Sequence, residues 1–181
     1  MGVIKTAFKW IAISIGGLIA LLFIALVAFG AATEIGIFPS TLVQTGDELP
    51  EKQYEALREA KILNRNEVVK FYYAEGMFDV AYSGSIMTDK RILGYWTEGE
   101  KDEAEIKVLS YDLKDINYLE LTEEGDSLTD AMYQVTVYGN SEDSLILYLS
   151  VEDDRHLEMV EALETQIAEN TARFEETESP N

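Results

Sequence analysis

Residues 131–151 read AMYQVTVYGNSEDSLILYLSV, and apolar side chains occupy every second position in two parts of this stretch. The apolar sets are Tyr133, Val135 and Val137 in the first part and Leu145, Leu147, Leu149 and Val151 in the second. Successive side chains of a β-strand point to opposite faces of its sheet, so each set predicts a strand with one core-facing side. The intervening Gly139-Asn140 is a turn signal.

The same period of two occurs in five stretches further upstream. They are VVKFYYA (68–74), FDVAYSG (78–84), RILGYWTE (91–98), AEIKVLSY (104–111) and INYLELT (116–122). Seven strands separated by short turns predict an antiparallel sandwich or barrel and argue against a parallel sheet.

A helix is predicted on each side of the strands. PEKQYEALREAKIL (50–63) has apolar residues at roughly helical spacing and predicts a short amphipathic helix. After residue 151 one apolar stripe is formed by Leu157, Val160, Leu163, Ile167 and Phe174. A helix with a single apolar stripe lies against a core and is not enclosed by it. The predicted fold class is therefore a mainly-β, seven-stranded antiparallel barrel or sandwich capped by a C-terminal amphipathic helix, with a disordered tail at 176–181.

The N-terminal part of the chain predicts a membrane anchor. Residues 10–33 carry no charge, and as a helix they would rise about 36 Å, enough to cross a hydrocarbon core of about 30 Å. We expect a transmembrane helix over 10–33, a cytoplasmic N-terminus over 1–9 and a linker over 34–49. Ala28-Phe29-Gly30 also fits a signal-peptidase site before Ala31, but the apolar stretch is longer than a typical signal h-region, which favours an uncleaved signal-anchor.

Basic residues predict how the chain is oriented. Lys5 and Lys9 precede the span, and only Lys52 is basic in the twenty residues after it. The positive-inside rule then predicts a single-pass protein of the cell membrane whose acidic C-terminal domain is extracytoplasmic.

Small residues within the span suggest a helix partner. Ala12, Gly16 and Ala20 are four residues apart, so they share one helix face and would allow a second helix to approach closely. The alternative is that small residues are simply common in membrane helices. The first interpretation predicts a membrane protein partner or a homo-oligomer.

Overall charge excludes one class of partner. The 181 residues include 14 Lys and Arg against 34 Asp and Glu, a formal net charge of −20. Such a field repels phosphate backbones, so no nucleic-acid partner is expected. The chain has no cysteine, which excludes disulfides and thiolate metal sites.

Two short segments carry a resemblance to a known family. SGSIMTDKRILGYW (83–96) resembles the hairpin between the second and third strands of bacterial pleckstrin-homology-like (PH-like) and GRAM-like domains, and residues 111–116 resemble the junction between their fourth and fifth strands. The resemblance covers about residues 64–175. It implies a barrel-like domain whose last helix closes one open end.

The hairpin also holds the candidate ligand contacts. In one interpretation Lys70, Lys90 and Arg91 converge on an anionic head group, as in related eukaryotic domains. In the other, Thr88 and Asp89 stabilise a turn and the two cations beside them stand in solvent. The surrounding acidity favours the turn.

No catalytic, metal or cofactor site is predicted. The sequence contains no H-E-x-x-H, G-x-S-x-G, P-loop or dinucleotide motif, and the acidic turns do not match a calcium-binding loop. His156, the only histidine, is expected at the surface in solvent.

The sequence thus favours a membrane-anchored, non-enzymatic binding or adaptor module that recognises a protein, either a neighbouring membrane subunit or an extended peptide added at a sheet edge. Outward-facing tyrosines are candidates for that surface. One alternative is an anionic-lipid reader whose domain faces the cytosol. Another is a hydrolase-type enzyme with a carboxylate site.

Overall fold

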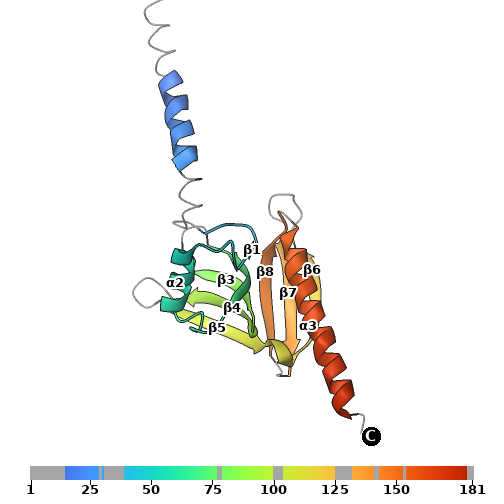
Figure 1. Cartoon of the computed structure of the whole chain (residues 1–181). Helices are drawn as coiled ribbons and strands as arrows, with labels where there is room; N and C mark the ends of the chain where they lie inside the picture. Colours follow the sequence, from blue (N-terminus) through green and yellow to red (C-terminus); the bar gives the residue numbers. More distant parts are fainter. Residues whose placement is uncertain are drawn as a thin grey trace, which may run out of the picture.

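The computed structural model describes residues 15–28, 30, 39–76, 79–99, 104–124, 132–140, 143–152 and 154–178. Its folded part contains two antiparallel sheets followed by a long helix (Figure 1). The first sheet has the order β1-β2-β3-β4-β5, and the second has the order β6-β7-β8.

The strands of the first sheet are β1 (Gln44–Thr45), β2 (Val69–Ala74), β3 (Ser83–Thr88), β4 (Arg91–Glu98) and β5 (Glu105–Asp112). Those of the second are β6 (Ile116–Glu124), β7 (Met132–Gly139) and β8 (Ser144–Ser150). The helical elements are α2 (Glu51–Glu59), the 3-10 turn η2 (Leu113–Asp115) and α3 (Arg155–Glu178).

The main core lies between the two sheets and α3. Alternate residues of β7 and β8, among them Val135 and Leu147, meet Ile92 of the first sheet and Leu163 of the helix. Burying a side chain of this size contributes about 1.5–3 kcal/mol. The core faces predicted at 131–151 are therefore confirmed except for Val151, which follows β8 and is not part of this core, and α3 lies against the second sheet (Figure 1).

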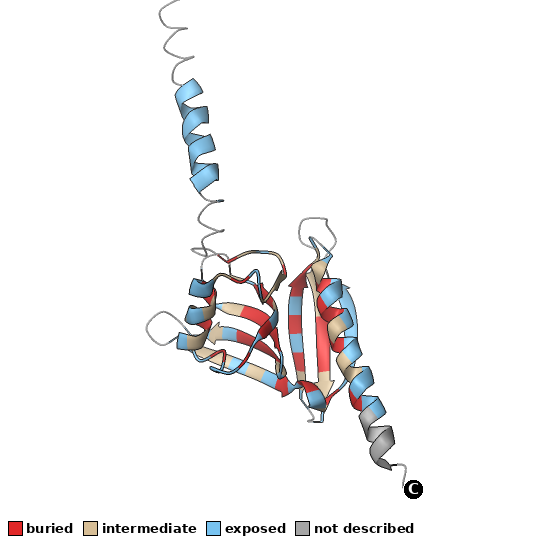
Figure 2. Cartoon of the chain, in the orientation of Figure 1, coloured by how far each residue is buried: buried red, intermediate tan, exposed pale blue. Residues whose placement is uncertain are grey.

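A second core covers the opposite face of the first sheet. There Leu57 of α2 and Ile62 just after it pack on Ile86, Leu93 and Tyr95. The centre of the first sheet is consequently buried on both faces, as the nearly continuous burial along β3 and the first half of β4 shows (Figure 2). The helix predicted at 50–63 forms over Glu51–Glu59 and belongs to the domain core.

Part of the predicted linker 34–49 is also integral to the fold. Val43 and Leu49 are buried, and β1 pairs with β2 between them. The N–H of Gly46 donates to the carbonyl oxygen of Lys70 at 3.0 Å. A Cβ at position 46 would lie 1.9 Å from the carbonyl oxygen of Val69, so only glycine permits this approach.

Two strand predictions need correction. The strand expected at 78–84 instead runs from Ser83 to Thr88, because residues 80–82 form a turn before it. The sheets also do not close into a barrel: in the described part of the chain, no strand of one sheet pairs with a strand of the other. Instead β8 packs on the first sheet beside Gly94 of β4. A side chain at position 94 would crowd β8, because its Cβ would lie 3.1 Å from Leu145 and 3.3 Å from Leu147.

The buried side of α3 also differs from the predicted stripe. Leu157 is 49% exposed, whereas Met159, Val160 and Leu163 are buried. Asn170 is buried as well, and its side-chain amide donates to the carbonyl oxygen of Leu113 at 2.7 Å. The helix is thereby fixed to η2, the crossover between the sheets. It continues to Glu178, into the tail predicted to be disordered, and 179–181 lie outside the described residues.

Helical residues are also described within the predicted membrane span, at 15–28 and 30, and all of them are exposed (Figure 2). None of the helices that the structure describes is both long and apolar enough to qualify as a membrane span. Residues 10–14, 29 and 31–33 of the predicted span lie outside the described residues. The anchor remains a prediction from the sequence.

Candidate functional site

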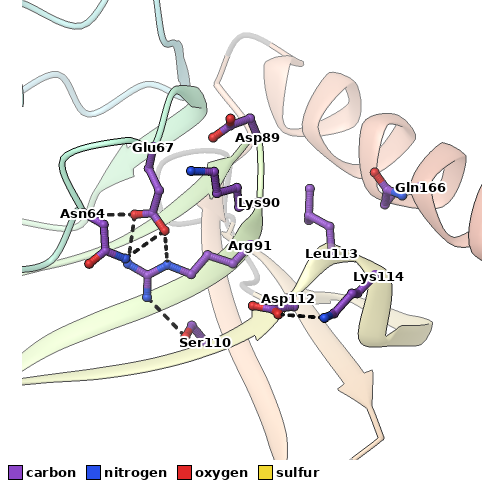
Figure 3. Close-up of a pocket in the computed structure, with 10 residues that line it drawn as sticks. All are labelled: Asn64, Glu67, Asp89, Lys90, Arg91, Ser110, Asp112, Leu113, Lys114 and Gln166. Carbon is purple, nitrogen blue, oxygen red and sulfur yellow. Dashed lines mark hydrogen bonds and ion pairs between the residues drawn. The ribbon is translucent and has the colours of Figure 1, made fainter.

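The β3–β4 hairpin, where the head-group contacts were expected, is organised by an ion pair. Arg91 at the start of β4 faces Glu67 in the loop before β2, with Nε 2.6 Å from Oε1 and Nη2 3.0 Å from Oε2 (Figure 3). The side chain of Glu67 is 3% exposed and that of Arg91 is 15% exposed. The pair therefore lies beneath the surface and joins the loop to the sheet.

The ionisation of Glu67 is set by this environment. Burial by itself would raise the pKa of Glu67. Hydrogen bonds from the Arg91 guanidinium and from the main-chain N–H of Asn64 outweigh that effect and lower the pKa to about 2. Glu67 is therefore a stable carboxylate at neutral pH, and it has no proton to donate.

Arg91 has little capacity left for a ligand. A guanidinium has five N–H donors. Glu67 accepts two of these N–H groups. A second N–H of Nη2 donates to the carbonyl oxygen of Ile62 at 2.9 Å, and an N–H of Nη1 donates to Ser110 Oγ at 3.2 Å. The expectation that Arg91 stands in solvent is wrong; it stabilises the domain.

The part of the turn interpretation that concerns Thr88 and Asp89 is confirmed. Thr88 Oγ1 accepts the main-chain N–H groups of Lys90 and Arg91 at 3.1 and 3.0 Å. Asp89 Oδ1 accepts the N–H of Val68 at 2.9 Å, so both side chains satisfy backbone donors.

A surface pocket of about 630 Å³ lies beside the hairpin, between the first sheet, η2 and α3 (Figure 3). Its lining residues are Asn64, Glu67, Asp89, Lys90, Arg91, Ser110, Asp112, Leu113, Lys114 and Gln166. Three are acidic and three are basic, so the pocket has no excess positive charge. Lys114 lies 3.5 Å from Asp112, and Lys90 Nζ donates to the carbonyl oxygen of Asn66 at 2.5 Å.

Lys70 does not join this group. It is exposed on β2 and is not among the residues that line the pocket. The predicted convergence of Lys70, Lys90 and Arg91 is therefore not formed. What the structure brings together is Lys90, Arg91 and Lys114 with three carboxylates.

The remaining predicted positions are placed as follows. Gly16 and Ala20 share an exposed face of the N-terminal helix, and Ala12 lies outside the described residues. His156 was expected in solvent, but it is only 5% exposed, because the first turn of α3 places its ring 4.9 Å from that of Tyr133.

A different surface emerges on the side of the second sheet that faces away from α3. The register of β6, β7 and β8 aligns three cross-strand rows there. The rows are Tyr118–Tyr138–Ser144, Glu120–Thr136–Ile146 and Thr122–Gln134–Tyr148. We call these nine positions the tyrosine face.

Its aromatic side chains are ordered by contacts within the face. The rings of Tyr118 and Tyr138 stack with centroids 4.3 Å apart and planes 11° from parallel. The hydroxyl of Tyr138 donates to Glu120 Oε2 at 2.8 Å, a hydrogen bond that raises the pKa of Tyr138. The face is therefore a pre-arranged surface.

The tyrosine face is unusual in its charge. Charged residues make up 27% of the chain, yet Glu120 is the only charged member of the nine. Tyr118 is 50% exposed, Ile146 47% and Tyr148 36%. The strand periodicity had signalled outward tyrosines, but only the register shows which of them lie together.

Comparison with solved structures gives two partial matches. A pleckstrin homology domain from Shewanella amazonensis SB2B is 18% identical, with a TM-score of 0.39, over 65% of this chain and 95% of that one. A duf1696 family protein with a pleckstrin-homology domain from Shewanella loihica PV-4 is 19% identical, with a TM-score of 0.43, over 71% of this chain and 94% of that one. Comparison with protein-family models and with curated proteins gave no match.

Proposed function

We propose that this chain is a membrane-anchored, non-catalytic recognition module whose PH-like domain binds a protein partner through the tyrosine face. One observation carries the proposal: a sheet face with three tyrosines, one isoleucine and a single charge, on which Tyr118, Ile146 and Tyr148 are exposed, in a chain with a net charge of −20. Depletion of charge together with enrichment of tyrosine is the compositional mark of the centre of a protein–protein interface.

Energetics favour a protein partner for this surface. Tyrosine contributes a large contact area with few rotatable bonds, so little conformational entropy is lost when a partner covers it. Tyr118 and Tyr138 are already held against each other, which lowers that loss further.

The pocket supplies an argument against the lipid-reader alternative. An anionic head group needs an excess of positive charge, but Arg91 is paired with Glu67, Lys114 lies 3.5 Å from Asp112, and Lys90 already donates one of its N–H groups to Asn66. Three carboxylates in the same pocket would repel a phosphate.

The carboxylate-enzyme alternative is weakened by the same geometry. Glu67 is the most buried carboxylate of the pocket, and its pKa of about 2 deprives it of a proton at neutral pH. General acid catalysis requires a pKa near the working pH.

The exposed apolar side chains of the N-terminal helix support the proposed membrane anchor. Its described residues include nine large apolar side chains that are 54–68% exposed, from Ile15 to Val27. Exposed apolar area of this extent is unfavourable in water and favourable in a hydrocarbon core.

A pair of matched charge substitutions tests the proposal. Ile146 on the tyrosine face and Leu157 on α3 are 47% and 49% exposed, on opposite sides of the second sheet. Tagged full-length wild type, Ile146→Asp and Leu157→Asp are purified from their native membrane in mild detergent, and the ratio of co-purified protein to bait is measured.

We expect a stoichiometric protein partner with wild type and with Leu157→Asp, and its loss with Ile146→Asp. Thermal unfolding of both variants confirms that they are folded. A partner retained equally by all three chains, or a wild type that purifies alone, would refute the proposal.

A further inference from the structure

We infer that the tyrosine face docks a protein segment bearing arginine or lysine side chains, which stack on Tyr118 and pair with Glu120. This inference rests on the proposed function and specifies the chemistry of the partner. Three independent features of the second sheet support it.

The first is the distribution of charge along the chain. Residues 115–154, which include the whole second sheet, contain eleven Asp and Glu and no Lys or Arg. All 14 basic residues lie elsewhere in the sequence. Three of these acids lie within β6, none lies in β7 or β8, and the others flank the strands. This stretch of the sequence therefore has no basic residue of its own to balance Glu120, and complementarity favours a cationic partner over a neutral or acidic one.

The second feature is the geometry of the aromatic pair. Tyr118 uses one ring face to stack on Tyr138, yet it remains 50% exposed. A guanidinium or ammonium group is attracted to an open tyrosine ring by the quadrupole of that ring, and arginine is the more frequent partner. Stacked tyrosines therefore provide a flat platform for a cation.

The third feature is the position of Glu120. It lies two residues from Tyr118 on the same face of β6, and Tyr138 holds one of its carboxylate oxygens at 2.8 Å. A carboxylate accepts several hydrogen bonds, so a fixed Glu120 retains acceptor sites for a cation seated on Tyr118. A planar guanidinium can satisfy both contacts at once.

The acidic residues of β6 disfavour the alternative in which two copies of this chain pair along their β6 strands. This strand forms one edge of the second sheet and carries Glu120 and Glu123. Like charges brought opposite each other are destabilising. A basic partner segment meets no such repulsion.

The test uses a defined peptide with the full-length chain in neutral detergent. The probe is a fluorescein-labelled decapeptide of alternating arginine and serine, and its control carries citrulline in place of arginine. Binding is followed by fluorescence anisotropy at 150 mM salt, where exposed charges are screened beyond about 8 Å, so that the diffuse field of the chain contributes little.

Matched substitutions separate the site from the overall charge. Glu120→Gln and Glu164→Gln each remove one exposed acid, the second of them on α3. Tyr118→Leu and Tyr82→Leu each remove one exposed ring, the second of them in the turn before β3. Thermal unfolding confirms that all four variants are folded.

We expect wild type to bind the arginine peptide at least about ten-fold more tightly than the citrulline peptide. Glu120→Gln and Tyr118→Leu should each weaken binding about three- to five-fold. Glu164→Gln and Tyr82→Leu should bind as wild type does.

Equal affinities for all four variants, or no binding of the arginine peptide by wild type, would overturn the inference. If the native partner is lost with Ile146→Asp while the peptide result is negative, the proposed function stands and the cationic chemistry fails. If the native partner survives Ile146→Asp, the proposed function itself fails, whatever the peptide does.

Discussion

Arg91 and Glu67, 24 residues apart in the sequence, form a two-point ion pair beneath the surface of the first sheet. The guanidinium also holds the carbonyl oxygen of Ile62, the residue that anchors the segment after α2 in the second core. A residue that resembled a ligand contact in the sequence therefore joins α2, the following loop and β4.

Removing the arginine should destabilise the domain strongly. Arg91→Ala leaves Glu67 as a buried charge without its cation, which typically costs about 3–5 kcal/mol. Lys90→Ala, one residue earlier and exposed, should change the free energy of unfolding by less than about 0.5 kcal/mol. Urea unfolding of the full-length chain in neutral detergent measures both, and equal effects would show that Arg91 is not structural.

Stability should depend on pH through Glu67. Its pKa in the folded chain is about 2, below the ordinary value of 4.5, so ionised Glu67 stabilises the fold above pH 4.5 and this contribution is lost as the pH falls towards 2. The full contribution is about 3 kcal/mol.

Glu67→Gln tests that dependence. The difference in unfolding free energy between wild type and the variant should shrink as the pH falls from 4.5 towards 2. Glu48 also has a pKa lowered to about 2, chiefly by its hydrogen bond with Arg155. Because Glu48 is present in both proteins, its contribution cancels from the difference. A difference independent of pH over this window would contradict the assignment.

The close approach of β1 to β2 should make Gly46 intolerant of a side chain. Gly46→Ala would place a methyl group against main-chain atoms of Val69, which cannot move without breaking the strand pair. At Gly94 the nearest atoms are the ends of leucine side chains, at 3.1 and 3.3 Å, and these can adjust. We expect Gly46→Ala to lower the unfolding midpoint clearly more than Gly94→Ala, and the reverse order would contradict this account.

Anchoring and orientation can be tested together because the chain has no cysteine of its own. Single cysteines replace exposed Glu98 of β4 and Thr6 of the N-terminus. A membrane-impermeant maleimide should label Glu98→Cys in intact cells and Thr6→Cys only after lysis, and alkaline carbonate should leave both in the membrane. Inverted labelling, or release of the protein into the supernatant, would contradict the predicted topology.

The sequence predicted most of the fold because the second sheet has one buried face. Leu145, Leu147 and Leu149 alternate with outward residues, which identifies both the strand and its core side. In β3 both faces are buried, so the alternation is absent and the strand was placed too early. β1 has only two residues and no periodicity to detect.

The candidate site was harder to predict from the sequence than the fold. Glu67 lies in a loop outside any motif, so nothing local marked it as the partner of Arg91. His156 was placed in solvent because its neighbours are charged, although the rotation of the helix turns its ring towards Tyr133. The tyrosine face combines residues from three strands, and only their register brings Tyr118, Tyr138 and Ile146 together.

Site-specific photo-crosslinking in the native membrane tests the central claim most directly. A benzophenone amino acid is placed in turn at Tyr118, Ile146 and Tyr148 of the tyrosine face and at Leu157 of α3 in the full-length chain. Protein recognition through this face predicts one adduct of the same mass from the three face positions and none from position 157. The absence of adducts from the face, or an equal yield at position 157, would contradict it.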